Sequence, residues 1–302
     1  MSRIQEILAK AERDGTARRT TPGGFTATPG PSAFVPPPVI TPRVDGTSAL
    51  DEATFVRTDE APPAPAAAAS STVEPRPVTA GIRLQPPEGR TASASLHPLL
   101  VAAIDPHSTA AEHYRSVRAR ISHREETMPI RTLMLTSPGA GDGKSITAAN
   151  LALTMAQEFQ RQVVLVDADF RGSSVHALFG LDAAPGLAEV LEGELTLDEV
   201  MVYLPDYRLT VIPAGRTPQF PTELLGSTAM RRITDALRGR FDRVLFDTPA
   251  VMPLADAGTL APMADGVLIV VRAGQTQRPA LQRALAAFDE ERVLGVVLND
   301  TV

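Results

Sequence analysis

Apolar residues beyond about position 96 fall into short continuous runs that alternate with longer stretches of mixed polarity. Continuous apolar runs bounded by turn residues are typical of strands buried on both faces, and the stretches between them have the length of helices. The alternation predicts an α/β fold whose mostly parallel sheet is covered by helices on both faces. The expected strands are 130–136, 162–167, 208–213, 243–247, 266–271 and 293–298, and the expected helices are 110–122, 144–160, 173–179, 187–191, 196–203, 228–238, 255–261 and 279–291.

The first part of the chain has a different composition. About half of its 27 prolines lie between residues 21 and 95, in a segment with few apolar residues and no periodicity. Such a segment cannot bury enough apolar surface to offset the entropy of the chain. We therefore expect a short amphipathic helix over residues 1–14, a Pro/Ala-rich disordered tether over 15–95, and a single α/β domain over 96–302.

Composition narrows the class of protein. The net charge is -6 without a block of basic residues, so nucleic acid is not an expected partner. The absence of cysteine excludes disulfides, thiolate metal sites and thiol catalysis. No apolar run approaches the length of a membrane span, and the N-terminus lacks the apolar core of a signal peptide. We expect a cytoplasmic protein that reaches a membrane only through a partner or a surface helix.

A glycine-rich turn lies between an apolar run and an alanine-rich helix at residues 131–150. Such a turn can direct backbone N–H groups at a polyphosphate, which the N-terminus of the following helix also attracts. Lys144 would reach the β- and γ-phosphates, and Ser145 would hold Mg²⁺. The pattern G-x-x-x-x-G-K-[ST] is met only in its last three positions, because Pro138 replaces the first glycine, and an ordinary Gly/Ser-rich loop is the alternative. The expected nucleotide contacts are Gly139, Gly141, Asp142, Gly143, Lys144, Ser145 and Ile146.

Two more apolar runs end in aspartates. One ends in Asp167 and Asp169, and the other ends in Asp247. In open parallel sheets ligands bind outside the carboxyl ends of the strands, so these carboxylates are expected beside the phosphate loop. Mg²⁺ prefers hard oxygen ligands, which makes Ser145, Asp247 and Asp167 the candidate metal ligands. A lone aspartate at a strand end could equally be a turn former or a helix cap, but together with Lys144 the set favours a nucleotide site.

The expected helix 110–122 carries Glu112, Arg115 and Arg118 at i, i+3 and i+6. This spacing places one carboxylate and two guanidiniums on one stripe of the helix. Spacing alone indicates local ion pairs on a solvated face.

Together these motifs resemble the bacterial tyrosine kinases of capsule and exopolysaccharide biosynthesis, called BY-kinases, which are P-loop ATPases. The resemblance runs from about residue 97 to the end of the sequence and rests on the loop 137–145 and the motifs 164–171 and 244–249. The family also has an E-x-x-R-x-x-R helix for ring-like self-association, which Glu112, Arg115 and Arg118 match. Smaller similarities occur at 174–180, 213–215, 221–225 and 295–299.

The resemblance implies an ATP- and Mg²⁺-dependent protein-tyrosine kinase, or a kinase-derived ATPase, that regulates capsule or exopolysaccharide biosynthesis and export. Lys144 would neutralise the γ-phosphoryl group together with Mg²⁺ held by Ser145 and Asp247, while Asp167 would orient and deprotonate a tyrosine hydroxyl. Asp169 and Arg171 would support them. The resemblance also implies a membrane polysaccharide co-polymerase as partner, which would recruit the chain to the inner face of the membrane.

Asn299, at the end of the last expected strand, is a candidate for the adenine side of the pocket, although a strand-terminating turn residue would look the same.

The sequence departs from the family pattern at three places. Phe220 stands where asparagine is common, and Ala250 stands where a second proline is usual. Family members also carry a tyrosine cluster after the last strand, whereas this sequence has only Tyr114, Tyr203 and Tyr207. The missing cluster leaves open whether the chain phosphorylates itself.

Two other functions fit the same fold. A septum-positioning or partition-type ATPase usually has a lysine near the start of the loop, where this chain has Gly139. A nucleotide-binding scaffold without turnover would not need Lys144, Asp167 and Asp247, and all three are present.

Overall fold

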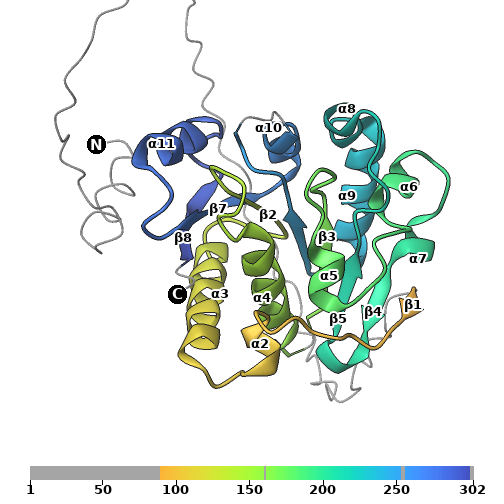
Figure 1. The fold of residues 1–302 in the computed structure, drawn as a ribbon, viewed down its shortest axis with the longest axis horizontal. Coiled ribbons are helices and arrows are strands. Elements are labelled where there is room, and N and C mark those ends of the chain that lie inside the picture. Colours follow the sequence, from red (N-terminus) through yellow and green to blue (C-terminus); the bar gives the residue numbers. More distant parts are fainter. Residues whose placement is uncertain (1–88, 160, 253–255, 300–302) are drawn as a thin grey trace, which may run out of the picture. The chain divides into compact units, whose positions relative to one another are not determined.

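The computed structural model describes residues 89–159, 161–252 and 256–299. The expected N-terminal helix and nearly all of the expected tether lie outside the described residues. Within the described part, eight strands form one sheet in the order β1-β4-β5-β3-β6-β2-β7-β8 (Figure 1). All neighbouring strands in this sheet are parallel except β4 and β5. The strands are β1 (Arg90–Thr91), β2 (Thr132–Thr136), β3 (Val163–Asp167), β4 (Val202–Leu204), β5 (Leu209–Ile212), β6 (Arg243–Asp247), β7 (Gly266–Arg272) and β8 (Val293–Asn299).

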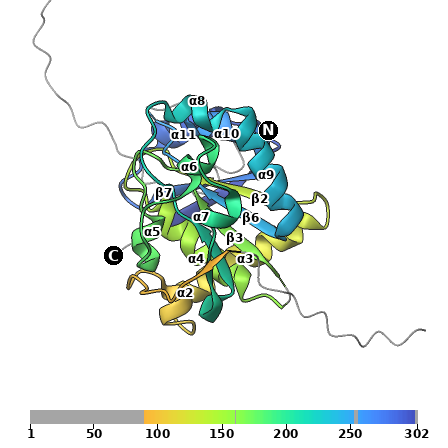
Figure 2. The ribbon, with the colours of Figure 1, turned by 90° about the vertical axis from the view of Figure 1, so that its right-hand side faces the viewer.

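Helices cover both faces of this sheet (Figures 1 and 2). Because side chains alternate between the faces of a strand, Leu133 and Leu135 of β2 belong to one apolar core and Met134 belongs to the other. The first core is completed by α2 (Val101–Ile104), α3 (Thr109–Glu125), α4 (Lys144–Ala156) and α5 (Val175–Phe179). The second is completed by α6 (Leu187–Leu191), α7 (Leu197–Val200), α8 (Pro221–Leu225), α9 (Thr228–Arg240), α10 (Asp256–Leu260) and α11 (Arg278–Ala286). The expected fold class is therefore confirmed.

All six expected strands are present, with ends shifted by no more than a few residues. The expected helix 196–203 is wrong in its second half, because α7 ends at Val200 and residues 202–204 form β4. The strand β4 pairs antiparallel with β5, and this pairing satisfies backbone groups that a longer helix would have used internally. The expected helices 144–160 and 279–291 are also too long, since α4 ends at Ala156 and α11 at Ala286. Three further elements, β1, α2 and α8, were not predicted from the sequence.

Residues before position 96 are hydrogen-bonded to the sheet and its helices. The backbone N–H of Arg90 donates to the Met201 carbonyl at 3.0 Å, and the N–H of Ser95 donates to the Phe179 carbonyl at 3.1 Å. The ordered domain thus includes at least residues 90–95, which we had expected to belong to the tether.

The strand order brings three candidate site segments together. In the sheet β6 lies between β3 and β2, so the segments that follow these three strands meet at one edge. In this register Asp247 is paired with Asp167 on β3 and with Leu135 on β2.

Candidate active site

The glycine-rich loop joins β2 to α4 and adopts a conformation that glycine favours. Gly141 has φ 83° and Gly143 has φ 89°, both in the left-handed region. A Cβ atom at Gly143 would also lie 1.9 Å from Asn299 Nδ2, so a side chain there would displace Asn299. The loop therefore requires glycine at position 143 for both its backbone angle and its close neighbour.

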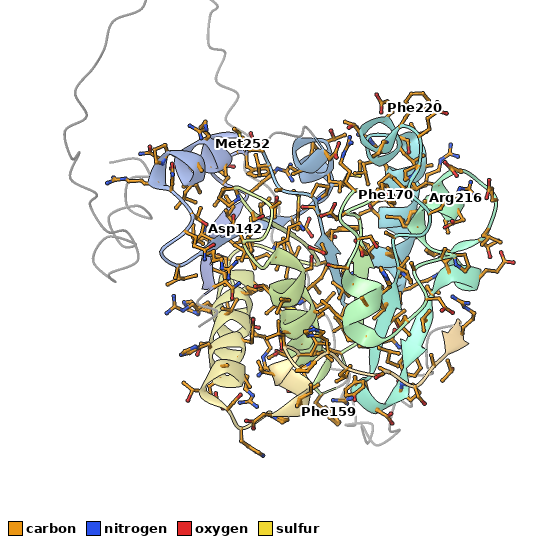
Figure 3. The ribbon with its side chains drawn as sticks, viewed as in Figure 1. Asp142, Phe159, Phe170, Arg216, Phe220 and Met252 are labelled. Carbon is orange, nitrogen blue, oxygen red and sulfur yellow. The ribbon has the colours of Figure 1, made fainter. Side chains whose placement is uncertain are left out.

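Side chains outside the loop hold its shape. Asp142 accepts hydrogen bonds from the Gly139 N–H at 3.0 Å and from the Thr276 hydroxyl at 2.8 Å. Asn299 Nδ2 donates to the Asp142 carbonyl at 3.0 Å. Figure 3 shows Asp142 in this loop, at the carboxyl edge of the sheet. Asp142 and Asn299, both expected to contact nucleotide, thus brace the loop, and Thr276 is a brace that the sequence analysis missed.

Lys144 begins α4 and pairs with a carboxylate from the neighbouring strand segment. Its Nζ lies 2.7 Å from Asp169 Oδ2, and only 13% of the lysine side chain is exposed. Burial disfavours the charged ammonium, but the carboxylates of Asp247 and Asp169 outweigh it and raise the pKa of Lys144. Lys144 is therefore held charged at the mouth of the loop.

Asp247, at the end of β6, is fully buried. Neither of its carboxylate oxygens has a hydrogen-bond partner among the described residues. Burial raises its pKa to about 8, the Asp167 carboxylate adds to this rise, and Lys144 and the Ser145 hydroxyl oppose it. Ser145 is close enough to affect this pKa, although its geometry is not that of a hydrogen bond. A buried carboxylate without a partner is costly, so this position requires a cation or a proton.

Asp167, at the end of β3, is oriented by backbone groups. Its oxygens accept the N–H groups of Asp169 at 3.1 Å, Ser174 at 3.2 Å and Val175 at 3.1 Å. Burial raises the pKa of Asp167 to about 6, against the opposing effect of these hydrogen bonds. Three of the roughly four acceptor positions of the carboxylate are thereby used, which leaves about one for a ligand or a substrate proton.

Arg171 extends from the same loop to a residue that the sequence analysis did not single out. Its Nε lies 2.8 Å from Oδ2 of Asp256, a fully buried residue at the start of α10. The hydroxyl of Thr222 donates to the other oxygen of Asp256. Asp169 accepts the backbone N–H groups of Arg171 and Gly172 through its Oδ1. An aspartate in the first turn of a helix usually interacts only with the N-terminus of that helix. The sequence therefore gave no indication of the contact between Asp256 and Arg171.

The site fits a magnesium ion. No group of three or more His, Cys, Asp or Glu side chains in the described ranges is arranged to hold a metal by itself. Mg²⁺ is usually held by one or two carboxylates and completes its shell with phosphate oxygens and water. The unpartnered Asp247 carboxylate beside Ser145 meets this requirement.

The expected self-association stripe lies on α3, away from these residues. Arg115 pairs with Glu112 and also donates to the Pro106 carbonyl. Arg118 Nη1 donates to the Thr154 carbonyl at 2.7 Å, and its Nε lies 3.2 Å from Glu158 Oε1. The Glu112 side chain is 61% exposed. Both arginines are thus engaged within the chain, while the glutamate is the accessible member of the stripe.

None of the described helices combines the length and the apolar character that a membrane crossing requires.

A phosphate loop that opens a helix at the carboxyl edge of a parallel sheet, with carboxylates on the adjacent strands, defines a P-loop NTPase. In agreement, residues 130–201 match the family model described as "ParA: NUBPL iron-transfer P-loop NTPase". The chain is 34% identical over 202 residues to tyrosine-protein kinase YwqD of Bacillus subtilis (strain 168), covering 66% of this chain and 85% of that protein. The chain belongs to the bacterial tyrosine-protein kinase family.

Two further comparisons agree with this assignment. Tyrosine-protein kinase ptk of Acinetobacter johnsonii is 33% identical over 193 residues, which cover 63% of this chain but only 26% of that longer protein. The crystal structure of the chimerical protein CapA2B2 superimposes with a TM-score of 0.64 at 28% identity, covering 68% of this chain and 92% of that one. The fold and the family expected from the motifs are thus confirmed.

Proposed function

We propose that this chain is an Mg²⁺-dependent protein-tyrosine kinase that transfers the γ-phosphoryl group of ATP to a tyrosine of another molecule. The observation that carries the proposal is the convergence of Lys144, Asp167 and the unpartnered Asp247 on one glycine-rich loop. Its family relationship to named tyrosine-protein kinases supports the same chemistry.

Each group of site residues has its own role in this proposal. The loop amides and the N-terminus of α4 bind the phosphates, and Lys144 moves from Asp169 to the γ-phosphoryl oxygens. Ser145 and Asp247 would hold Mg²⁺, with Asp167 as a further candidate ligand, and the ion would supply charge neutralisation on the phosphate oxygens.

Asp167 is oriented by three N–H groups and has a pKa near neutrality, which suits it to accept the proton of the tyrosine hydroxyl. The tyrosine oxygen forms a bond to the γ-phosphorus as the bond to the β-γ bridging oxygen breaks, and ADP leaves.

An acceptor from another molecule is favoured by the burial of the chain's own tyrosines. Tyr114, Tyr203 and Tyr207 are all half-buried, and burial raises the pKa of Tyr114. By contrast, Phe220 and Met252 are exposed at the same end of the domain as the site (Figure 3). They offer apolar surface on which an acceptor segment can lie.

The wider role is part of this proposal. Residues 96–302 act as the kinase domain together with residues 90–95, which are hydrogen-bonded to it, and the preceding residues from position 15 act as the tether behind the N-terminal helix. We propose that the activity regulates capsule or exopolysaccharide biosynthesis and export, a role that the resemblance to the family supports. In this proposal a membrane polysaccharide co-polymerase recruits the cytoplasmic chain, and the chain self-associates into a ring through α3.

The test is incubation of the purified full chain with γ-labelled ATP and Mg²⁺, with and without a tyrosine-containing acceptor polymer and a candidate co-polymerase. Phosphate release and phosphotyrosine are followed together. We expect label on the acceptor that disappears in Lys144→Ala and persists in Lys10→Ala, a change at the only other lysine. Phosphate release without labelled tyrosine would instead identify a kinase-derived ATPase, and the absence of both would overturn the proposal.

A further inference from the structure

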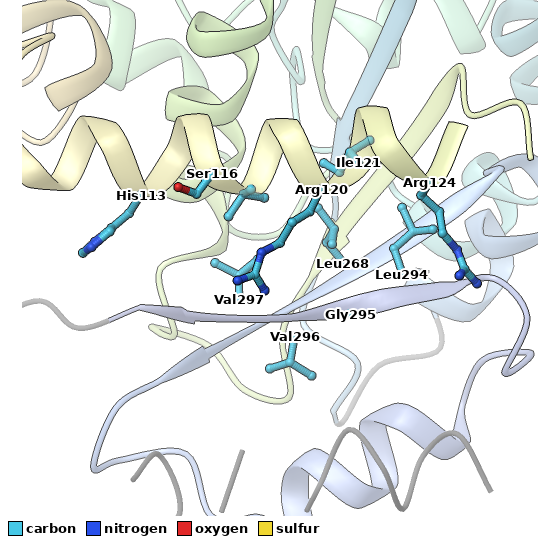
Figure 4. Close-up of a pocket in the computed structure, with 11 residues that line it drawn as sticks. His113, Ser116, Arg120, Ile121, Arg124, Leu268, Leu294, Gly295, Val296 and Val297 are labelled. Carbon is cyan, nitrogen blue, oxygen red and sulfur yellow. The ribbon is translucent and has the colours of Figure 1, made fainter. Parts of the chain in front are cut away.

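A groove lies between α3 and β8, the strand at one edge of the sheet. Figure 4 shows α3 running alongside β8, with Arg120 and Arg124 extending from the helix toward the strand. The cavity has a volume of about 320 Å³, and its apolar lining includes Val117, Leu294 and Val297. The groove thus combines apolar surface with two cationic side chains.

The two arginines of the groove have no anionic partner in the described part of the chain. Both Arg120 and Arg124 are exposed, whereas Arg115 and Arg118 of the same helix pair with carboxylates. Arg118 and Arg120 are two residues apart, so at about 100° per residue they point to opposite sides of α3. The groove arginines are therefore open to an anionic ligand and lie away from the self-association stripe.

The strand β8 adds backbone groups to this surface. Within the described ranges it pairs only with β7, so its outer edge has N–H and C=O groups without a strand partner. Gly295 lies inside β8, and a Cβ atom built on it would meet no atom beyond its chain neighbours within 4 Å. Val296 packs into the core on the other face, so this open space faces α3. A glycine inside a strand often marks the close approach of another backbone. The edge therefore favours an extended peptide over a small molecule.

The spacing of the arginines fits acidic side chains on a strand. Arg120 and Arg124 are separated by four helical residues, which rise about 6 Å. Two residues of a strand rise about 6.6 Å, and side chains at i and i+2 point to the same face. A strand lying along β8 with acidic residues at i and i+2 would therefore present its carboxylates at the spacing of the two guanidiniums. Apolar residues on either side of them would lie on Val117 and Val297.

We propose that the α3–β8 groove binds an extended acidic segment of a partner protein. The segment adds to β8 as a further strand and places two carboxylates, at positions i and i+2, on Arg120 and Arg124. Binding uses neither nucleotide nor the residues of the phosphate site, so it can fail while the proposed kinase activity stands.

Fluorescence anisotropy with a labelled peptide and the full chain tests this inference. The probe Thr-Val-Thr-Glu-Thr-Glu-Thr-Val carries both glutamates and both valines on one face of a strand. We expect it to bind at least about tenfold more tightly than Thr-Val-Thr-Lys-Thr-Lys-Thr-Val, with an affinity that falls as salt rises. Absence of binding, or equal binding of the two peptides, would overturn the proposal.

A second peptide separates strand addition from charge attraction. Thr-Val-Glu-Thr-Thr-Glu-Thr-Val has the same composition as the probe, but its glutamates at i and i+3 point to opposite faces of a strand. We expect it to bind at least about fivefold more weakly, because only one carboxylate can reach the arginines. Equal affinity of these two peptides would refute strand addition.

Variants of the chain identify the groove as the site. Arg120→Glu/Arg124→Glu should abolish binding of the probe, whereas the matched variant Arg231→Glu/Arg232→Glu, on exposed positions of α9, should retain it. Binding that survives in Arg120→Glu/Arg124→Glu would place the site elsewhere.

A variant without a change of charge guards against an effect on the fold. Gly295→Val fills the open space of the groove with a residue that strands favour, so it should weaken binding without lowering the thermal unfolding temperature. Unchanged affinity in Gly295→Val would contradict the close approach of a strand to β8.

Sedimentation velocity without peptide tests a second copy of the chain as the occupant. The measurement uses the Glu112→Arg background, which reverses the charge of the exposed stripe residue. We expect the same sedimentation coefficient with and without Arg120→Glu/Arg124→Glu. A smaller coefficient in the variant would mean that a second copy occupies the groove, and it would overturn the assignment to a partner segment.

Discussion

Lys144 Nζ lies 2.7 Å from Asp169 Oδ2, so the lysine that we assign to phosphate binding is paired with a carboxylate of its own chain. A nucleotide must therefore compete with Asp169 for this cation. Because Asp169 Oδ1 also accepts two backbone N–H groups, the carboxylate is fixed while the lysine is able to move.

Asp169→Asn should separate nucleotide binding from turnover. The amide still accepts the backbone hydrogen bonds but no longer pairs electrostatically with Lys144. A charge-assisted hydrogen bond contributes about 1.5–3 kcal/mol, so we expect nucleotide affinity to rise about tenfold. We expect turnover to fall, since Asp169 supports the reacting groups. Titration calorimetry with a non-hydrolysable ATP analogue measures the first effect, with the exposed Asp182→Asn as control. Weaker analogue binding in Asp169→Asn would contradict the competition.

The raised pKa of Asp247 predicts how stability depends on pH. Its pKa is about 8 in the folded chain, against about 3.9 in an unfolded one. The folded state therefore binds more protons between these values, and the free energy of unfolding should fall as the pH rises from about 4 to about 8. Asp167 acts in the same direction up to a pH of about 6.

Asp247→Asn should remove most of this dependence. In urea unfolding without nucleotide, we expect the variant to come closest to the wild type near pH 4, where the carboxyl is protonated in the folded chain and about half protonated in the unfolded chain, and to exceed the wild type by at least about 1 kcal/mol near pH 8. Asp235→Asn, at an exposed position of α9, serves as the control. If Asp247→Asn instead loses a similar amount of stability at both pH values, the carboxyl group stabilises the site by its packing and not through its protonation.

The α3 stripe predicts different effects for its members. Arg118 donates to Thr154 and pairs with Glu158, so Arg118→Ala should lower the free energy of unfolding by about 1 kcal/mol even in a monomer. Glu112 is exposed, so Glu112→Arg should leave stability nearly unchanged and abolish self-association through this helix. Sedimentation velocity and thermal unfolding separate the two effects, with Glu126→Arg at the end of α3 as control. An identical sedimentation profile for wild type and Glu112→Arg would remove the stripe from any subunit interface.

The sequence motifs were sufficient to predict most strands of the sheet and the reacting groups. The remaining elements and contacts depend on tertiary structure and could not be predicted from local sequence. Continuous apolar runs marked six strands, because strands buried on both faces have no polar alternation. The run Leu197, Val200, Met201 and Leu204 has helical spacing, so β4 was expected to be helix until its pairing with β5 was seen. A strand as short as β1, with two residues, leaves no periodic signal.

The site residues likewise divide into those that local motifs predict and those that only tertiary contacts reveal. Lys144, Asp167 and Asp247 follow from motifs that lie within a few residues of each strand end. Thr276 and Asp256 do not, because they contact Asp142 and Arg171 across 134 and 85 positions of the chain. Their roles depend on which loops the strand order brings together, and no local pattern encodes that.

The Arg171–Asp256 pair gives the last prediction. Asp256 is fully buried, and in the described part of the chain its carboxylate is neutralised by Arg171 and accepts a bond from Thr222. Arg171→Ala would leave a buried charge without its cation, so we expect a loss of about 2 kcal/mol or more in the free energy of unfolding. Asp256→Asn keeps the shape and removes the charge, and it should cost less while freeing the Arg171 side chain.

The double variant Arg171→Ala/Asp256→Asn should therefore be more stable than Arg171→Ala alone. Urea unfolding of the four proteins in this cycle measures the coupling between the two side chains. Additive losses would show that Arg171 does not neutralise Asp256 in solution. If the coupling is present and kinase turnover falls in both single variants with little change in ATP affinity, Asp256 acts on the reaction by orienting Arg171.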